Sequence, residues 1–292
     1  MMQPTIITTA YVAAHLPSRP ADSHKGTYGT LLALCGSYGM AGAALLCARG
    51  ALRSGVGLLR AAVPRSVYPL LVEAIPEAVF CPVAEQDGGF SADAIPALTD
   101  ALAIADAVVA GCGIGRGEGQ TAVVRHLLAH STVPVILDAD GINAVTPHIL
   151  TEETRSAPLI LTPHPGEMAR LLGVSTAEVQ ADRQAVACRL ARETGAIVVL
   201  KGHHTLVAAS DGTVMENHTG NSGMATGGSG DVLAGIIGAL VAQGVPPYEA
   251  AVCGVYLHGA AGDLAAAKHS QHGMLPTDLI EELCSLFLQF EK

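Results

Sequence analysis

The sequence has no tryptophan and few other aromatic residues, with six Tyr and four Phe among 292 residues. Charged residues are also sparse at 14%, whereas half of the chain is apolar and glycine occurs 33 times. A core must therefore be built mainly from small aliphatic side chains, a composition that is typical of tightly packed α/β proteins. The length suits one large domain or two small ones.

Positive charge is scarce as well. The 16 Lys and Arg residues are outnumbered by 26 Asp and Glu residues, the net charge is −10, and the chain contains no basic run. We therefore expect neither nucleic acid nor an anionic membrane as a partner. An anionic cofactor would have to be held locally, by backbone N–H groups and a few cations.

Signals for export or membrane insertion are missing too. The seven cysteines include no Cys-x-x-Cys pair, which favours buried thiols in a reducing compartment over disulfides or a metal site. Residues 1–15 lack a basic segment followed by an apolar run, so we expect no signal peptide. The uncharged run 232–248 is shorter than the roughly 20 apolar residues that span a bilayer. We therefore predict a buried helix there and a cytoplasmic protein.

Apolar runs bounded by Gly, Pro and Asp alternate with longer helical patterns. This alternation predicts a mostly parallel central sheet with helices on both faces. The sequence shows no mixed Gly/Ser/Pro linker and no internal repeat, which favours a single domain over residues 1–292 with a core from about 20 to 290. The predicted strands are 30–35, 57–63, 107–110, 133–137, 158–161, 196–200 and 205–209, and the predicted helices are 42–54, 120–129, 166–172, 177–194, 231–243, 247–267 and 276–286.

Unusual residue clusters follow the ends of the predicted strands. Ligands of such folds sit where strands end and loops enter helices, so we expect these clusters to form a site at one edge of the sheet. Two of the clusters, 36–43 and 111–115, are glycine-rich and are weak signals when taken singly, because tight turns in a compact α/β fold would be the preferred explanation if the other clusters were absent. The clusters are 36–43, 111–115, 138–143, 162–167, 201–205 and 217–231.

The strongest signal is the glycine-rich stretch 217–231, which ends at Asp231 before an apolar helix. Glycines let the backbone approach an anion closely, and the helix N-terminus adds partial positive charge. An aspartate repels phosphate there, unless its carboxylate takes a proton from a hydroxyl that attacks the phosphate. The alternative is that Asp231 only caps the helix. The spacing matches neither a Walker loop nor a dinucleotide-binding loop.

Lys201 follows a predicted strand and begins the segment Lys-Gly-His-His-Thr. It is a candidate point charge for phosphate, and the alternative is a solvated lysine in a hairpin turn. The adjacent His203 and His204 would point to opposite faces if they lie on a strand, so we do not expect a two-His metal site.

Two further strand ends carry polar side chains. His164, between two prolines, can hydrogen-bond a substrate or be a structural loop residue. In 138–143, the carboxylates of Asp138 and Asp140 with Asn143 can orient a hydrated Mg²⁺, and capping or turn formation explains the same residues equally well.

Together these segments resemble the ADP- or ATP-dependent NAD(P)H-hydrate dehydratases of the ribokinase-like superfamily. The resemblance runs in the family's order from about residue 25 to residue 240. Cys112 and Ala41 stand where relatives commonly have proline, and we expect altered loop stiffness at most. The matching stretches are 25–29 (Lys-Gly-Thr-Tyr-Gly), 36–43, 53–57, 111–115, 138–143, 161–167, 201–205 and 220–231.

The resemblance implies dehydration of the (6S) hydrate of NADH or NADPH with ADP or ATP as phosphoryl donor and with Mg²⁺, for which no ligand is assigned. It implies Asp231 as the general base and contacts to the hydrate from Ala43, Gly113 or Gly115, His164 and Asp231. It also implies an NAD(P)H-hydrate epimerase on a separate chain and a homo-oligomer, for which we expect a tetramer. The implied nucleotide-binding residues are Lys201, Gly202, His203, His204, Thr205, Asn221, Gly227, Gly228, Ser229 and Gly230.

Two other functions remain open at this point. A small-molecule kinase of the same superfamily, acting on a hydroxymethyl group of a thiazole or pyrimidine, would share the glycine-rich stretch and Asp231. A non-catalytic nucleotide sensor would gain nothing from a carboxylate beside phosphate, so Asp231 argues against it.

Overall fold

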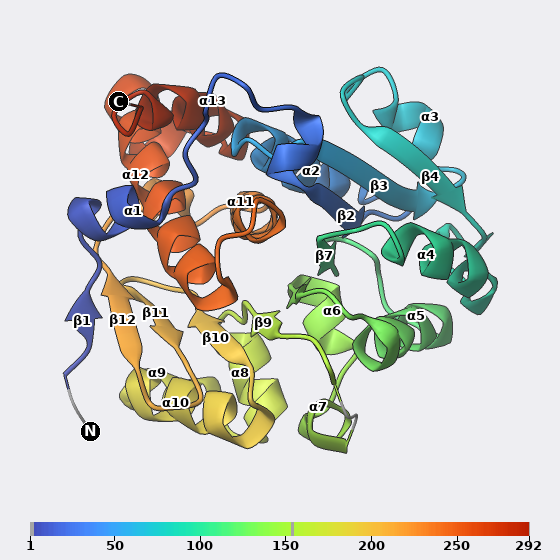
Figure 1. The fold of residues 1–292 in the computed structure, drawn as a ribbon. Coiled ribbons are helices and arrows are strands. Elements are labelled where there is room, and N and C mark those ends of the chain that lie inside the picture. Colours follow the sequence, from blue (N-terminus) through green and yellow to red (C-terminus); the bar gives the residue numbers. More distant parts are fainter. Residues whose placement is uncertain (1–2, 153–154, 292) are drawn as a thin grey trace.

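A ten-stranded sheet runs through the computed structural model, which describes residues 3–152 and 155–291. The strand order is β1-β12-β11-β10-β9-β8-β7-β2-β3-β4 (Figure 1). β11 is antiparallel to both of its neighbours, and the other strand pairs of this sheet are parallel. The strands are β1 (Thr5–Ile6), β2 (Thr30–Leu34), β3 (Leu58–Pro64), β4 (Val79–Val83), β7 (Ala107–Ala110), β8 (Val135–Leu137), β9 (Leu159–Leu161), β10 (Ile197–Leu200), β11 (Thr205–Ala208) and β12 (Val214–Asn217), and β5 (Glu85–Gln86) with β6 (Gly89–Phe90) forms a separate hairpin.

Helices cover both faces of this sheet (Figure 1). Successive residues of β2 alternate between the two layers: Leu31 packs with the layer of α2 and α11, and Leu32 with the layer of α4 and α5. The first layer contains α1 (Thr9–His15), α2 (Ala41–Arg53), α3 (Tyr68–Leu71), α11 (Ser229–Ala242), α12 (Pro247–Gly273) and α13 (Pro276–Phe287). The second contains α4 (Ile95–Leu102), α5 (Glu118–His130), α6 (Ala139–Asn143), α7 (Pro147–Glu152), α8 (Pro165–Leu172), α9 (Thr176–Ala181) and α10 (Arg183–Thr194).

The α/β architecture predicted from the sequence is confirmed. Every predicted strand is present, with ends that shift by one or two residues. One helix prediction is wrong, because 177–194 is divided at Asp182 into α9 and α10. The Asp182 backbone leaves the helical region (φ −148°, ψ 76°), and its carboxylate accepts a hydrogen bond from the N–H of Ala185 to cap α10.

The apolar run 232–248 divides between two helices and does not form one. α11 is buried along most of its length, as we predicted for this run. Among the described residues, α12 is the one helix long and apolar enough to cross a membrane, and 61% of its apolar window is buried inside the protein. It packs against α11 and α13, which identifies it as a core helix of this fold.

The topology brings the carboxyl ends of the parallel strands to one edge. After β4 the chain returns to place β7 on the other side of β2, so the strand order reverses between β2 and β7. The loops after β2, β7, β8, β9 and β10 therefore meet at this edge, which is where open α/β sheets bind ligands.

Candidate active site

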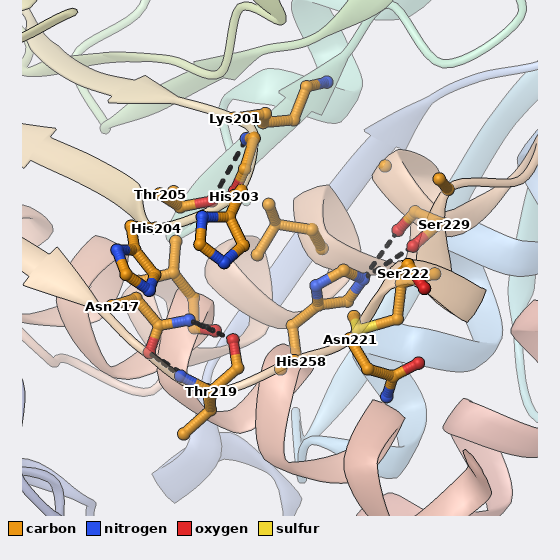
Figure 2. A pocket seen from close by; sticks show the side chains of 18 of the residues that line it. Lys201, His203, His204, Thr205, Asn217, Thr219, Asn221, Ser222, Ser229 and His258 are labelled. Carbon is orange, nitrogen blue, oxygen red and sulfur yellow. Dashed lines mark hydrogen bonds between the residues drawn. The ribbon is translucent and has the colours of Figure 1, made fainter. Parts of the chain in front are cut away.

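A cleft of about 720 Å³ lies at this edge, between the β10–β11 turn, the glycine-rich stretch and α12 (Figure 2). Gly228 and Asp231 adjoin it without lining it. Most of the residues that we predicted to bind nucleotide line the cleft, together with His164. These lining residues are Lys201, Gly202, His203, His204, Thr205, Asn221, Gly227, Ser229 and Gly230.

Lys201 is held by a buried carboxylate. Its Nζ lies 2.6 Å from Oδ1 of Asp138, and the two side chains are 20% and 1% exposed. The hydroxyl of Thr162 donates to the same oxygen at 2.8 Å. Burial alone would lower the pKa of Lys201, but Asp138 and Glu167 outweigh it, so the pKa is raised and the ammonium stays charged. The alternative of a solvated lysine is therefore wrong.

Asp231 lies in the first turn of α11. The helix begins at Ser229, and its N-cap is Gly228, whose φ of 96° favours glycine. A Cβ built on Gly230 would lie 3.2 Å from Nζ of Lys201, so the helix backbone closely approaches the ammonium. Asp231 is not the cap, and the capping interpretation is wrong.

The electrostatics of Asp231 suit a proton acceptor. Burial raises its pKa to about 6, and the neighbouring Asp138 adds to this increase. A hydrogen bond from the Cys112 thiol and the charge of Lys201 oppose it. A carboxylate with such a pKa is largely ionised at neutral pH and is a stronger base than an ordinary aspartate.

Cys112 has more than a loop-stiffening role. Its Sγ lies 3.9 Å from Oδ2 of Asp138, and Cys112, Asp138 and Asp231 present ligand atoms within 4.8 Å of one another. From the sequence we expected that cysteine in place of the family's proline at position 112 would change loop stiffness at most. That expectation did not include the contact between the Cys112 thiol and Asp138. Ala41, the other departure, is the first residue of α2, a position at which proline is common in helices.

Three of the five predicted hydrate-binding residues, Ala43, Gly113 and Gly115, form a second group beside Cys112. A Cβ on Gly113 would lie 2.7 Å from Cβ of Ala43, so the loop after β7 touches α2. The N–H of Gly115 donates to Oδ2 of Asp140 at 3.0 Å. Ala43, Gly113 and Gly115 do not line the cleft, and Asp231, which adjoins both Cys112 and Gly230, lies between the two regions.

The carboxylates of 138–143 are engaged within the protein. Asp138 accepts from Lys201, and Asp140 accepts from Gly115 and lies 3.6 Å from Nε of Arg116. Asp138 is the N-cap of α6 but its side chain makes no capping bond. Oxygens of Asp138 and Asp231 lie close together beside Lys201 and the Cys112 thiol, outside the lining of the cleft, so no Mg²⁺ ligand is assigned among the described residues.

His164 is the N-cap of α8. Its Nδ1 accepts hydrogen bonds from the N–H groups of Gly166 and Glu167, and the Glu167 carboxylate accepts from its backbone N–H. Nδ1 therefore carries no proton, and a neutral ring bears its proton on Nε2. The ring is half-exposed and lines the cleft, so His164 is both a structural cap and available to a ligand.

Comparisons with known proteins agree with this geometry. The family model described as NAD(P)H-hydrate dehydratase matches residues 31–285. The ADP-dependent (S)-NAD(P)H-hydrate dehydratase of Neisseria meningitidis is 45% identical over 85% of this chain and 80% of its own length. The chain belongs to the NAD(P)H-hydrate dehydratase family.

Two solved structures share its fold. The ADP/ATP-dependent NAD(P)H-hydrate dehydratase of Bacillus subtilis, co-crystallised with ATP/Mg²⁺, superposes over all of both chains with a TM-score of 0.87 at 38% identity. A ribokinase-like superfamily protein from Enterococcus faecalis has a TM-score of 0.85 at 27% identity and covers 98% of this chain and 96% of its own. The predicted ribokinase-like fold is therefore confirmed.

Some relatives are longer. A bifunctional NAD(P)H-hydrate repair enzyme of Moorella thermoacetica is 45% identical over 95% of this chain but only 53% of its own length. The chain thus spans about half the length of this bifunctional relative.

Sequence reasoning missed the contribution of α12 to the cleft. Val255, His258 and Gly259 line the cleft, and Asp263 contacts the glycine-rich stretch from the same helix. Nε2 of His258 lies 2.9 Å from the carbonyl oxygen of Ser229 (Figure 2), and burial lowers the pKa of this histidine to about 4. Asp263 accepts from the N–H of Gly220 and from the amide of Asn221. Both hold the glycine-rich stretch against α12. The one sequence signal of His258 and Asp263 was their polarity within residues 250–267, the otherwise apolar part of α12.

The reasoning about His203 and His204 rested on a wrong premise. Both residues lie in the turn before β11 and not on a strand. Their rings stack at 3.9 Å between centroids, side by side at the cleft (Figure 2). The ring of His204 also stacks on the ring of His218. From the sequence we considered only His203 and His204 and did not predict this contact.

Proposed function

We propose that this chain converts the (6S) hydrate of NADH or NADPH back to the reduced cofactor, with ADP or ATP as the phosphoryl donor. The observation that carries the proposal is the placement of Asp231, a buried carboxylate of raised pKa, in the first helical turn beside the Lys201–Asp138 pair. The membership of the NAD(P)H-hydrate dehydratase family supports the choice of substrate.

The mechanism begins with phosphoryl transfer. The Asp231 carboxylate accepts the proton of the C6 hydroxyl, and the hydroxyl oxygen attacks the terminal phosphorus of the nucleotide. The bond to the leaving phosphate oxygen breaks, which releases AMP from ADP or ADP from ATP. Backbone N–H groups of Gly227 to Gly230 and the ammonium of Lys201 stabilise charge on the transferred group.

Elimination follows. Phosphate is a far better leaving group than hydroxide, so the lone pair of the ring nitrogen expels it from C6. Loss of a proton from C5 then restores the 5,6 double bond and the dihydronicotinamide. The phosphorylated hydrate is an intermediate of this lyase reaction, whereas a kinase would release it as its product.

The residue roles follow the two regions of the site except for His164, which lines the cleft and is assigned to the hydrate. Lys201 to Thr205 and the glycine-rich stretch bind the nucleotide, whereas Ala43, Gly113 or Gly115 and His164 contact the hydrate. Mg²⁺ would neutralise charge on the phosphates of the nucleotide, and no residue is assigned as its ligand, because Asp138 is paired with Lys201 and Asp231 is the proposed base. Its use by this chain is supported by the crystallisation of the Bacillus subtilis relative with ATP/Mg²⁺.

Four further features stay predictions. The ten-stranded sheet with both faces covered supports a single domain over residues 1–292. Free cysteines, most of them buried, support the reducing cytoplasm. A homotetramer and a separate NAD(P)H-hydrate epimerase chain complete the proposal. Light scattering tests the homotetramer. The separate epimerase is tested by adding an NAD(P)H-hydrate epimerase to a mixture of the two hydrate epimers, from which recovery of the cofactor should become faster.

One assay tests the proposed function. The protein is incubated with NADH hydrate and Mg²⁺, with ADP, with ATP or with no nucleotide, and recovery of dihydronicotinamide absorbance is followed. We expect recovery only with nucleotide, and one nucleotide consumed per cofactor restored. A stable phosphorylated product would favour the kinase, and tight ADP binding without turnover would favour the sensor.

A further inference from the structure

A group of metal-ligating side chains lies on one face of the β11–β12 hairpin. Thr205 pairs with Asn217 in this antiparallel pair, so the preceding His204 faces the following His218. Glu216 precedes His218 by two residues and lies on the same face, because side chains alternate along a strand. The hairpin register therefore brings two imidazoles and a carboxylate together.

The ligand atoms converge on one carboxylate oxygen. Oε1 of Glu216 lies 3.0 Å from Nδ1 of His204 and 3.1 Å from Nε2 of His218. The imidazole rings stack at 4.1 Å with an interplanar angle of 5°. The side chains of His204, Glu216 and His218 are 40%, 23% and 42% exposed, so an ion from solvent can reach them.

These spacings match a transition-metal ion. Zn²⁺ binds imidazole nitrogen and carboxylate oxygen at about 2.0–2.2 Å with tetrahedral geometry, which separates neighbouring ligand atoms by about 3.3 Å. The observed separations to Glu216 need to widen by a few tenths of an ångström, and one imidazole ring must rotate out of the stack, because parallel stacked rings cannot both direct an in-plane lone pair at one ion. Mg²⁺ prefers all-oxygen ligands and does not fit this set.

We propose that His204, Glu216 and His218 form a binding site for Zn²⁺ or a similar divalent transition-metal ion. Both histidines line the cleft, so the ion would lie at its rim and tie the β10–β11 turn to β12. A water molecule or a ligand in the cleft would complete the tetrahedron. The site is separate from the Asp138–Asp231 carboxylates, and it does not depend on the proposed dehydratase activity.

The test measures binding of Zn²⁺ alone, without nucleotide or hydrate, by competition with a chromophoric chelator. We expect one Zn²⁺ per chain with no competition from Mg²⁺. Loss of a supporting residue around a metal typically costs 10–100-fold in affinity, so His204→Ala or His218→Ala should cost at least about tenfold. Glu216→Gln keeps the shape of the side chain and should also weaken binding. Melting temperatures establish that each variant is folded.

The chain offers a matched control. His126 and His130 stack at 4.3 Å on α5 but belong to none of the three-residue ligand clusters in residues 3–152 and 155–291. The double variant His126→Ala/His130→Ala should bind Zn²⁺ as the unmodified protein does. Unchanged affinity in folded His204→Ala and His218→Ala would overturn the proposal, as would loss of binding in the α5 double variant.

Discussion

Lys201 and Asp138, 63 residues apart in the sequence, form a buried ion pair with Nζ 2.6 Å from Oδ1. The pair joins the ends of β10 and β8 and sets the ammonium directly beside Gly230 at the start of α11. Lys201 therefore both stabilises the fold and places positive charge where the proposed phosphoryl group would be transferred.

Replacing Lys201 with alanine should consequently have two effects. Breaking a buried ion pair leaves Asp138 uncompensated, and we expect a loss of about 3–5 kcal/mol in the free energy of unfolding. Loss of a charge-assisted hydrogen bond should weaken ADP binding by roughly 1.5–3 kcal/mol. Denaturant titration and calorimetry measure the two quantities.

A double variant separates these effects. Lys201→Met combined with Asp138→Asn removes both charges, so much of the stability should return while ADP affinity stays low. Wild-type ADP affinity in the double variant would confine Lys201 to a structural role.

The sequence predicted seven of the ten strands of the main sheet and missed β1 and β4 at its edges and β12 beside β1. β2, β7 and β8 are continuous buried apolar runs, which are readable from sequence. β1 is a two-residue exposed strand at one edge, and β4, at the other, is only partly buried and contains Pro82. Such strands are defined by their partners and not by their own pattern.

The candidate site was predictable to a similar degree. Glycines and strand-end polar residues marked the loops, so Lys201 and Asp231 stood out. The partner of Lys201 depends on which strands are neighbours, and local sequence does not encode that. His258 was missed because it lies in the interior of α12, where only its contact with Ser229 gives it a role.

Removing the Cys112 thiol should change the pH dependence of activity. The thiol hydrogen bond holds the pKa of Asp231 lower than burial alone would, so Cys112→Ala should raise this pKa above about 6. The acidic limb of the kcat/KM profile should then move to higher pH, since the base must be ionised. Cys188→Ala, in α10, serves as a control because Cys188 does not influence Asp231. An unmoved limb in Cys112→Ala would contradict this role of the thiol.

His164 can be tested by a substitution that preserves its capping role. Asparagine is a favourable N-cap, so His164→Asn should keep the melting temperature within a few degrees. If the ring contacts the hydrate, KM for the hydrate should rise while ADP affinity is unchanged. His24→Asn is the matched control, because His24 also accepts a backbone N–H through Nδ1, from Gly26, and does not line the cleft. Equal kinetics in the two variants would make His164 a cap alone.

Asp231→Asn should make the protein more stable and far less active. Because burial raises the pKa of Asp231 to about 6, the folded state loses stability as pH rises from about 4 through 6. Asparagine carries no such charge, so the variant should gain roughly 1–3 kcal/mol above pH 6, and the gain should shrink as pH falls toward 4. Turnover should fall by roughly 10²–10⁴-fold, because the general base is lost. ADP affinity should hold or rise, since a negative charge near phosphate is gone.

The control for Asp231→Asn is Glu118→Gln, an exposed substitution in the first turn of α5, which should alter neither stability nor turnover. Melting temperature and turnover measured on the same preparations decide the matter, and near-normal turnover in a stable Asn variant would rule out Asp231 as the base.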